Sequence, residues 1–237
     1  MIPKVINQVW FGREGKDPFV IPLYKNCAEH NEKFLENFEL KLWTKDDCYK
    51  LVEEYFPQYK QKFNSLFKDI LRMDIIRYMI MYVHGGFYYD HDIQLKKNMI
   101  NNLNHKALFV TEIILSKKSC ENVAKNNLIR CGVPEDEIRV ANYFMGSEPG
   151  HNIWLVLLKE VFERIDKNPQ CITETTSKIP VSQYDILYLT GPDAITHIVN
   201  RYDSKEITLL NLQQSRSFVQ HLASGTWRKD LPNNINK

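Results

Sequence analysis

Two aspartates one residue apart, Asp90 and Asp92, lie in the stretch HGGFYYDHDIQ at residues 84–94. Carboxylate oxygens are preferred ligands of hard cations such as Mg²⁺ or Mn²⁺, and such an ion neutralises charge on a departing diphosphate. In an extended segment both side chains would project from one face, about 6 to 7 Å apart at Cα, so one ligand could meet both. We assign Asp92 to direct metal binding, and Asp90 to a contact through water or with a sugar hydroxyl. A chain with 13 aspartates is expected to hold about one such pair by chance, so its surroundings must support the assignment.

A second charged pair, Asp74 and Arg77, stands three positions apart in RMDIIRY. On a helix this spacing brings the two side chains onto one face. Taken alone, the pair is typical of a surface ion pair worth a few tenths of a kcal/mol. The alternative is that both side chains bind a ligand, and the neighbouring sequence has to decide.

Strand-like and helix-like segments alternate along the chain and would position these side chains. Segments rich in β-branched and aromatic residues predict strands at residues 4–12, 38–43, 87–89, 107–115 and 139–146. Helices are predicted from the TKDD capping sequence to Phe56, as one long amphipathic helix over residues 63–83, over residues 151–168, and after Gly191-Pro192. Gly85 and Gly86 are placed to end the long helix. The alternation predicts an α/β sheet covered by helices, with Asp90 and Asp92 at the carboxyl end of a strand, where such sheets bind ligands.

The composition limits the class of protein. Of the 237 residues 43% are hydrophobic, and 31 basic side chains nearly balance 29 acidic ones; this allows one substantial core and gives no strong attraction to nucleic acid. The N-terminal sequence lacks the pattern of a secretory signal, and the longest apolar run is far shorter than the roughly 20 residues that span a bilayer. Five scattered cysteines without CxxC spacing indicate neither a disulfide framework nor a structural zinc site. We expect one domain, no nucleic-acid partner, no transmembrane segment, and a location in the cytoplasm or at the periphery of a membrane.

Three blocks carry a resemblance to a known family: IPKVINQVWFG at the start, RMDIIRYMIMYVHGGFYYDHD in the middle and TGPDAITHI later. They resemble the DXD-containing sugar-binding glycosyltransferases, which include yeast initiating mannosyltransferases, bacterial capsular-polysaccharide transferases and, more distantly, the clostridial glucosylating toxins. The matching blocks span most of residues 2–227. The resemblance implies a GT-A (Rossmann-like) nucleotide-sugar-binding fold with a mostly parallel central sheet flanked by helices, as a single domain over residues 1–237. It also implies a retaining transferase that uses a UDP- or GDP-sugar with Mn²⁺ or Mg²⁺ and acts on a glycan or lipid-linked saccharide.

The same resemblance implies roles for individual residues. The catalytic set would be Asp90, Asp92, Asp74 and Arg77, and the metal ligands would be Asp92, Asp90 and His221. The donor would contact Gln8, Val9, Trp10, Asp74, Arg77, Tyr88, Asp90, Asn142, Thr226 and Trp227. Residues 217–229 would close over the diphosphate as a lid, and residues 230–237 would be a frayed tail. Two positions depart from the family pattern: Asn7 stands where relatives usually have His, which affects a structural hydrogen bond, and Met73 stands where they often have Ser.

Several alternatives stay open at this point. Asn142 could be a strand-end amide that satisfies backbone groups, and Trp227 could fill the edge of the core. The TGPDAI segment could build a turn and a helix start near the acceptor, or its Gly-Pro could be only turn punctuation. His91 is expected to point away from the aspartates, in contact with solvent or behind the ligands. For the whole protein the alternatives are a sugar-binding module without turnover and, less favoured, an Asp-nucleophile phosphatase.

Overall fold

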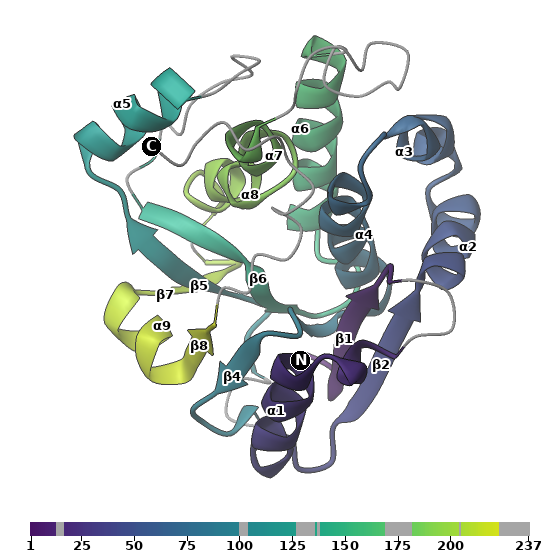
Figure 1. The fold of residues 1–237 in the computed structure, drawn as a ribbon, viewed down its shortest axis with the longest axis vertical. Coiled ribbons are helices and arrows are strands. Elements are labelled where there is room, and N and C mark those ends of the chain that lie inside the picture. The colour runs from purple at the N-terminus through teal and green to yellow at the C-terminus, as the bar shows by residue number, and fades with distance from the viewer. Residues whose placement is uncertain are drawn as a thin grey trace.

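The computed structural model describes residues 1–12, 17–99, 104–126, 136, 138–168, 182–203 and 205–222. Its centre is a six-stranded sheet with the order β2-β1-β3-β6-β5-β7 (Figure 1). The strands are β1 (Val5–Trp10), β2 (Glu39–Thr44), β3 (Gly86–Tyr89), β5 (Ala107–Ile114), β6 (Ile138–Ser147) and β7 (Thr208–Leu210). Neighbours β1–β2, β1–β3 and β5–β7 run parallel, whereas β3–β6 and β5–β6 run antiparallel. The predicted α/β class with a mostly parallel sheet is therefore confirmed.

Helices cover the sheet, and a small second sheet lies beside it. The helices are α1 (Pro22–Asn31), α2 (Lys45–Tyr55), α3 (Lys60–Ser65), α4 (Asp69–His84), α5 (Lys117–Asn126), α6 (Ile153–Lys167), α7 (Gln183–Leu189), α8 (Pro192–Val199) and α9 (Leu212–Phe218). Short 3-10 turns are η1 (Pro18–Val20), η2 (Glu32–Phe34) and η3 (Pro57–Tyr59). The second sheet pairs β4 (Ile93–Leu95) with β8 (Val219–His221) in antiparallel fashion.

Two apolar cores lie on opposite faces of the six-stranded sheet. Side chains of a strand alternate between faces, so Tyr88 joins one core while Phe87 and Tyr89 join the other. The first core is built with α2, α4, α6, α7 and α8, and the second with β4, β8 and the end of α9. In Figure 1 the first group lies in the upper half of the view and the second in the lower half. The edge between the two groups is where the predicted site residues gather.

The long helix predicted over residues 63–83 is wrong in one respect, because the chain breaks between α3 and α4. Leu66 and Lys68 have extended backbones, with ψ of 128° and 131°. Arg72, in the first turns of α4, donates hydrogen bonds to the carbonyl oxygens of Phe63, Asn64 and Leu66. These bonds satisfy carbonyls that the end of a helix leaves without intrahelical partners. Since Leu66 is itself buried, the apolar spacing runs on across the break and gives no sign of it.

Gly85 and Gly86 end α4 as predicted. Their φ angles are +61° and +86°, a region that residues with a Cβ rarely adopt. A Cβ on Gly85 would lie 2.5 Å from the backbone nitrogen of Pro149, and one on Gly86 would lie 2.6 Å from the carbonyl oxygen of Val5. The two glycines therefore allow β3 to start immediately after the helix and to pack directly against β1.

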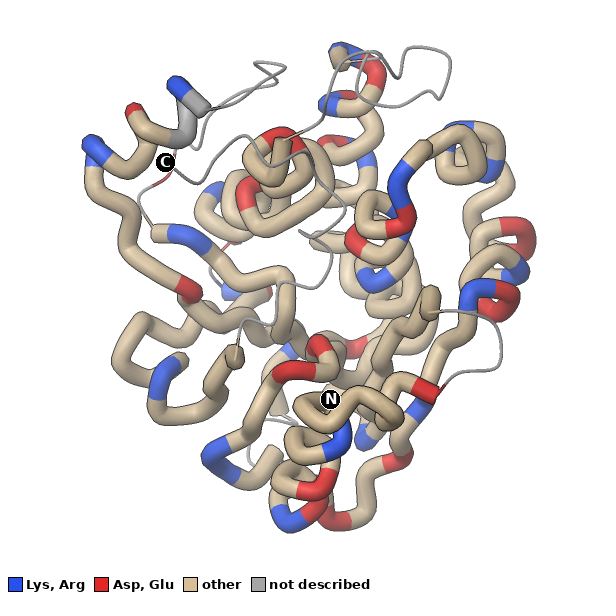
Figure 2. Tube along the Cα trace, in the orientation of Figure 1, with Lys and Arg blue, Asp and Glu red and all other residues tan. Residues whose placement is uncertain are grey.

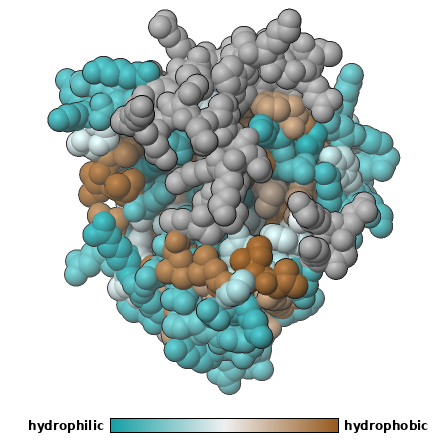
Figure 3. All heavy atoms as spheres, viewed as in Figure 1, coloured by the Kyte–Doolittle hydropathy of each residue, from teal (hydrophilic) through white to brown (hydrophobic). Residues whose placement is uncertain are grey.

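Basic and acidic residues are interspersed along the outer helices (Figure 2). Most of the described surface in this view is hydrophilic, and an apolar patch lies over the free ends of β5 and β6 (Figure 3). Its exposed members include Ile113, Ile114 and Ile138. Within the described part of the chain, no helix is long and apolar enough to cross a membrane.

Candidate active site

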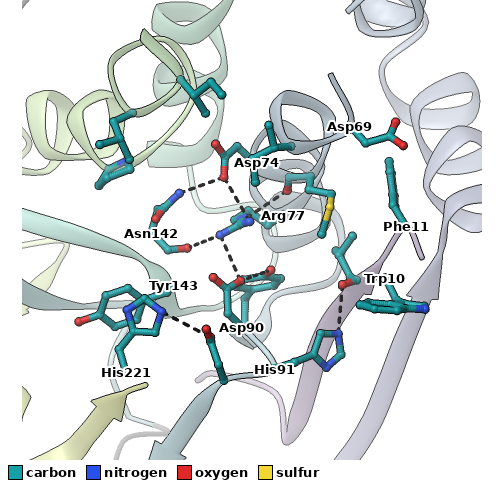
Figure 4. A pocket seen from close by; sticks show the side chains of 18 of the residues that line it. Trp10, Phe11, Asp69, Asp74, Arg77, Asp90, His91, Asn142, Tyr143 and His221 are labelled. Atoms are coloured by element: carbon teal, nitrogen blue, oxygen red, sulfur yellow. Dashed lines mark hydrogen bonds and ion pairs between the residues drawn. The ribbon is translucent and has the colours of Figure 1, made fainter. Parts of the chain in front are cut away.

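A pocket of about 480 Å³ opens at the carboxyl ends of β1 and β3 (Figure 4). This is the edge at which open α/β sheets bind ligands. The pocket brings together most of the residues predicted from the sequence: Val9, Trp10, Asp74, Arg77, Tyr88, Asp90, Asp92, Asn142 and His221. Residues far apart in the chain thus meet in one cavity of the size that small-molecule sites have.

The two aspartates lie on a tight turn and not on an extended segment. The turn joins β3 to β4 and is closed by the Ile93 amide, which donates to the Asp90 carbonyl oxygen at 3.1 Å. The expectation of an extended pair projecting from one strand face is therefore wrong, because residues 90–93 form a turn between the two strands. Both side chains still line the pocket, so the turn achieves the convergence that the extended geometry was expected to give.

Arg77 lies between two carboxylates at the floor of the pocket. Its guanidinium nitrogens lie 3.2 Å from an oxygen of Asp74 and 3.3 Å from an oxygen of Asp90, and the side chains of Arg77 and Asp74 are 3% and 4% exposed. The surface ion-pair alternative is thereby excluded for Asp74 and Arg77. Burial lowers the pKa of Arg77, but the charge of Asp90, followed by those of Tyr88 and Asp74, raises this pKa by more than burial lowers it. The guanidinium therefore stays charged.

Asp74 is held by three donors. Asn142 donates from Nδ2 at 3.0 Å, Thr190 donates from Oγ1 at 2.8 Å, and Arg77 supplies the ion pair. Burial raises the pKa of Asp74 to about 6, against the lowering effects of Arg77 and Thr190. Thr190 belongs to the TGPDAI segment, whose Pro192 lines the pocket. That segment therefore holds Asp74 through Thr190 and lines the pocket through Pro192.

Asp90 receives a further bond from the aromatic strand. The Tyr88 hydroxyl donates to Asp90 at 2.6 Å, and the Arg77 guanidinium lies 4.8 Å from the centre of the Tyr88 ring. Tyr88 therefore contacts both members of the ion pair between Arg77 and Asp90.

An irregularity in β6 turns two backbone carbonyls toward these groups. Between the pairs Phe109–Met145 and Thr111–Val140, one residue of β5 faces the four residues 141–144 of β6. The Asn142 carbonyl oxygen accepts from Arg77 at 2.9 Å, and the Tyr143 carbonyl oxygen accepts from the Asp90 amide at 3.0 Å. Bulges of this kind recur next to active sites because they redirect groups that a regular strand would use in its ladder.

His221 faces Asp92 from the second sheet. Its Nε2 lies 3.4 Å from Asp92 Oδ1, and its ring lies 4.2 Å from the ring of Tyr143 between centroids. Burial opposes protonation of His221, but the hydrogen bond and charge of Asp92 raise its pKa above the usual value. An imidazole nitrogen and a carboxylate oxygen directed at each other are a donor set that a divalent cation accepts.

The protein side chains by themselves supply only part of the ligand set that a metal ion needs. Among the residues that the structure describes, no three His, Cys, Asp or Glu side chains form a group that could hold an ion. Asp90 is engaged by Arg77 and Tyr88, whereas Asp92 and His221 face each other at 3.4 Å, and this pair is the one that the geometry favours as metal ligands. A donor set of this size is typical of Mg²⁺ sites in which phosphate oxygens of the substrate and waters complete the shell.

The opposite side of the pocket is aromatic. Trp10, Phe11 and Tyr24 line it. His91 is buried and not in solvent: its Nε2 lies 3.2 Å from the Val9 carbonyl oxygen, and its ring lies 5.7 Å from Trp10 and 5.4 Å from Tyr24 between centroids. As expected, His91 is directed away from Asp90 and Asp92; its ring packs against Trp10 and Tyr24 and lines the pocket with them.

Two residues of β1, Gln8 and Asn7, make hydrogen bonds within the fold and do not line the pocket. Gln8 does not line the pocket, and its amide donates to the Tyr89 carbonyl oxygen at 3.4 Å. Asn7 is fully buried, donates to the Gly85 carbonyl oxygen at 2.9 Å and accepts from Trp43 at 2.9 Å. The residue at this departure from the family pattern thus holds the helix end to the sheet.

Two predicted contacts, Thr226 and Trp227, lie outside the described residues. Conversely, the pocket contains Glu112 and Tyr143, which the sequence analysis missed. A signal for Glu112 was present: it is the one charged residue in the otherwise apolar and hydroxyl-bearing run ALFVTEIIL.

Comparison with solved structures identifies the fold. The structure described as "PaToxG Glycosyltransferase" superposes with a TM-score of 0.51, at 15% sequence identity, over 84% of this chain and 69% of that chain. At this identity the likeness concerns the fold alone, and the fold is that of the GT-A glycosyltransferases.

The sequence comparisons show which family the chain resembles. Residues 20–110 match the family model described as "Glycosyltransferase sugar-binding region containing DXD motif", and the predicted resemblance to these transferases is confirmed. An uncharacterized glycosyltransferase of Acanthamoeba polyphaga mimivirus is 24% identical over 98% of this chain and 86% of its own length. Inositol phosphoceramide mannosyltransferase 3 of Schizosaccharomyces pombe is 28% identical over 45% of this chain, which spans only 28% of that relative.

Proposed function

We propose that the protein is a metal-dependent glycosyltransferase that moves a hexose from a UDP- or GDP-sugar to a hydroxyl group of a glycan or lipid-linked saccharide, with retention of the anomeric configuration. The observation that carries this proposal is the charge cluster at the pocket floor, where buried Arg77 joins Asp74 to Asp90 one turn away from Asp92 and His221. Buried, mutually oriented charges in a cleft are typical of catalytic sites.

The donor is best accommodated with its base against the aromatic wall at Trp10 and its diphosphate at the aspartate turn. Arg77 would then lie close enough to offset phosphate charge, while Asp74 and Asn142 would meet sugar hydroxyls. A divalent ion held by Asp92 and His221, with Asp90 acting directly or through water, would supply charge neutralisation at the leaving diphosphate. The floor groups are fixed by mutual bonds before any ligand arrives, which is the arrangement that makes electrostatic stabilisation effective.

In the transfer itself, the acceptor oxygen forms a bond to the anomeric carbon while the bond from that carbon to the diphosphate oxygen breaks. Attack on the face from which the diphosphate leaves retains the configuration, and the hydroxyl proton passes to a diphosphate oxygen. The contribution of the chain is to orient donor and acceptor and to hold charges where they develop, both large terms in transfer reactions. The location, in the cytoplasm or at a membrane periphery, stays a prediction.

Donor hydrolysis tests the proposal without any acceptor. UDP-glucose, UDP-galactose and GDP-mannose are each incubated with the protein, with and without Mn²⁺ or Mg²⁺, and free sugar is measured. We expect metal-stimulated hydrolysis of at least one donor, and the loss of most of this stimulation in Asp92→Asn, because the substitution removes a carboxylate assigned to direct metal binding. Asp46→Asn, which changes an exposed carboxylate on α2, is the control and should retain wild-type activity.

The outcomes separate the alternatives. Hydrolysis that is equal with and without metal, or unchanged in Asp92→Asn, would contradict the metal assignment. Donor binding without any hydrolysis or transfer would indicate a sugar-binding module in place of an enzyme.

A further inference from the structure

Glu112 occupies a bulge in β5 that no part of the proposed donor site requires. Thr111 pairs with Val140 and Ile113 pairs with the adjacent Arg139, so Glu112 has no opposite residue on β6. A bulge of this kind releases one residue from the ladder and redirects its side chain. The Glu112 side chain lines the pocket and is 30% exposed.

The bulge is supported by specific contacts. The Thr111 amide donates to the Ser215 hydroxyl oxygen at 2.9 Å, and the Thr111 hydroxyl donates to the Leu210 carbonyl oxygen at 2.8 Å. Ser215 and Thr111 are both buried. The irregular register is therefore held by the Ser215 side chain of α9 and by the Leu210 backbone carbonyl of β7, and it is built into the fold.

The carboxylate of Glu112 is also oriented. Arg139 Nε lies 3.6 Å from Glu112 Oε2, and another nitrogen of Arg139 lies 2.9 Å from Asp193 Oδ1. The Asp193 side chain is only 3% exposed. Arg139 is thus fixed from behind by a buried acid at the start of α8, and it presents Glu112 to the cavity.

Glu112 belongs to the wall opposite the aromatic one. Figure 4 shows Trp10 and Phe11 on one side of Asp90 and Arg77, and Tyr143 and His221 on the other. Tyr143 stands in the bulged stretch of β6 that pairs with β5, the strand of Glu112, and both residues line the pocket. In accord with this arrangement, burial and then the charge of Glu112 raise the pKa of Tyr143. If the donor occupies the aromatic side, this second wall faces the reacting carbon.

We propose that Glu112 and Tyr143 form the acceptor subsite, and that the acceptor is a polyol or saccharide with neighbouring hydroxyls. A carboxylate accepts hydrogen bonds from two hydroxyls at once, and an aromatic ring offers an apolar surface with a polar end. The proposal rests on the transferase function proposed above. Glu112 binds the acceptor and takes no part in breaking the donor bond.

Partition between water and acceptor tests the subsite. Donor hydrolysis and transfer to methyl α-D-mannopyranoside or methyl α-D-glucopyranoside are measured for the wild type, Glu112→Gln and Glu121→Gln. Glu121 is exposed on α5 and serves as the matched control. We expect Glu112→Gln to keep its hydrolysis rate within about twofold and to lose roughly 10- to 100-fold in kcat/KM for the glycoside. The loss arises because the glycoside hydroxyls no longer donate hydrogen bonds to a charged carboxylate. Glu112→Asp should recover part of the loss.

A binding measurement makes the result independent of turnover. Saturation-transfer NMR is recorded for the same methyl glycosides with the wild type and Glu112→Gln, without donor. Binding to the wild type that weakens in Glu112→Gln supports the subsite even where no donor is hydrolysed, a result that would count against the proposed function alone. Equal binding to both proteins, no binding of either glycoside to the wild type, or parallel losses of hydrolysis and transfer in Glu112→Gln would each overturn the proposal.

Discussion

Arg77 carries a single positive charge that two carboxylates share, and this imbalance governs the chemistry of the pocket floor. Removing charges from water is costly, and an ion pair compensates for that cost only with good geometry and further hydrogen bonds. Arg77 has both, since Met73 and Asn142 supply carbonyl oxygens at 3.1 and 2.9 Å. Asp90 and Asp74 compete for the same guanidinium, and burial raises the pKa of Asp74 to about 6.

The raised pKa of Asp74 predicts a pH dependence of stability. The unfolded state has a pKa near 3.8 and the folded state one of about 6, so between these values the folded state binds more protons. The contribution of Asp74 to stability is therefore fully present below about pH 4 and is lost as pH rises through 6, by roughly 3 kcal/mol at about 1.4 kcal/mol per pKa unit. Urea unfolding of the wild type and of Asp74→Asn, at intervals from pH 4 to 7, measures the effect.

The difference between the two proteins isolates Asp74 from other titrating groups. We expect the free energy of unfolding of Asp74→Asn to rise relative to the wild type as pH increases from 4 to 6, and then to level off. A constant difference across this range would show that Asp74 titrates alike in the folded and unfolded states.

At the scale of elements, the aspartate turn is positioned by β4, which is held on both sides. On one side β8 pairs with it, and the Leu222 amide extends the pairing with a bond to the Asp92 carbonyl oxygen at 3.0 Å. On the other side Asn31 of α1 replaces a strand: its Nδ2 donates to the Ile93 carbonyl oxygen at 2.9 Å, and its Oδ1 accepts from the Leu95 amide at 2.8 Å. A buried amide side chain thus completes the ladder of a three-residue strand.

Asn31→Leu should weaken both the fold and the metal site. The replacement leaves a buried carbonyl and a buried amide without partners, at a cost of about 1 to 3 kcal/mol each. We expect the free energy of unfolding to fall by about 2 to 5 kcal/mol and the affinity for Mn²⁺ in the presence of UDP to fall as well, measured by urea unfolding and calorimetric titration. Asn26→Leu, on the exposed face of α1, is the control. Wild-type affinity for Mn²⁺ in a destabilised Asn31→Leu would show that the clamp supports the fold without positioning Asp92.

Elements also mark the limit of what the sequence predicts. The strands β1, β2, β3, β5 and β6 and the stop at Gly85 were predictable, because residue type and spacing encode them locally. The bulges that redirect Glu112 and the carbonyls of residues 142 and 143 depend on the register between β5 and β6, a tertiary property. The strands β4, β7 and β8 span three residues each, too few for an alternation pattern to be recognised.

For the molecule as a whole, the pocket lies where the two apolar cores meet. The first core supports Asp74 and Arg77 through α4, and the second supports the aspartate turn through β4 and β8. The charged side chains Asp74 and Arg77 from one half therefore face the aspartate turn from the other half. Contacts in the pocket span more than 60 positions of sequence, as from Asp74 to Asn142. The sequence identified the participants by family resemblance, whereas their hydrogen-bond partners required the folded chain.

The last prediction concerns the chain beyond Leu222, where the resemblance expects Thr226 and Trp227 to contact the donor. The Leu222 amide donates to the Asp92 carbonyl oxygen, so the described part of the chain ends beside the aspartate turn. A protein ending at Leu222 retains the buried residues Phe218 and Val219 and the pairing of β8 with β4. We expect it to melt cooperatively within a few degrees of the full chain and to bind UDP with Mn²⁺ at least about tenfold more weakly, since ring and hydrogen-bond contacts are each worth about 1 kcal/mol.

Trp227→Ala in the full chain separates the tryptophan from the rest of the segment. If the shortened protein binds UDP as tightly as the full chain, Thr226 and Trp227 are not donor contacts; if it unfolds, the segment belongs to the core.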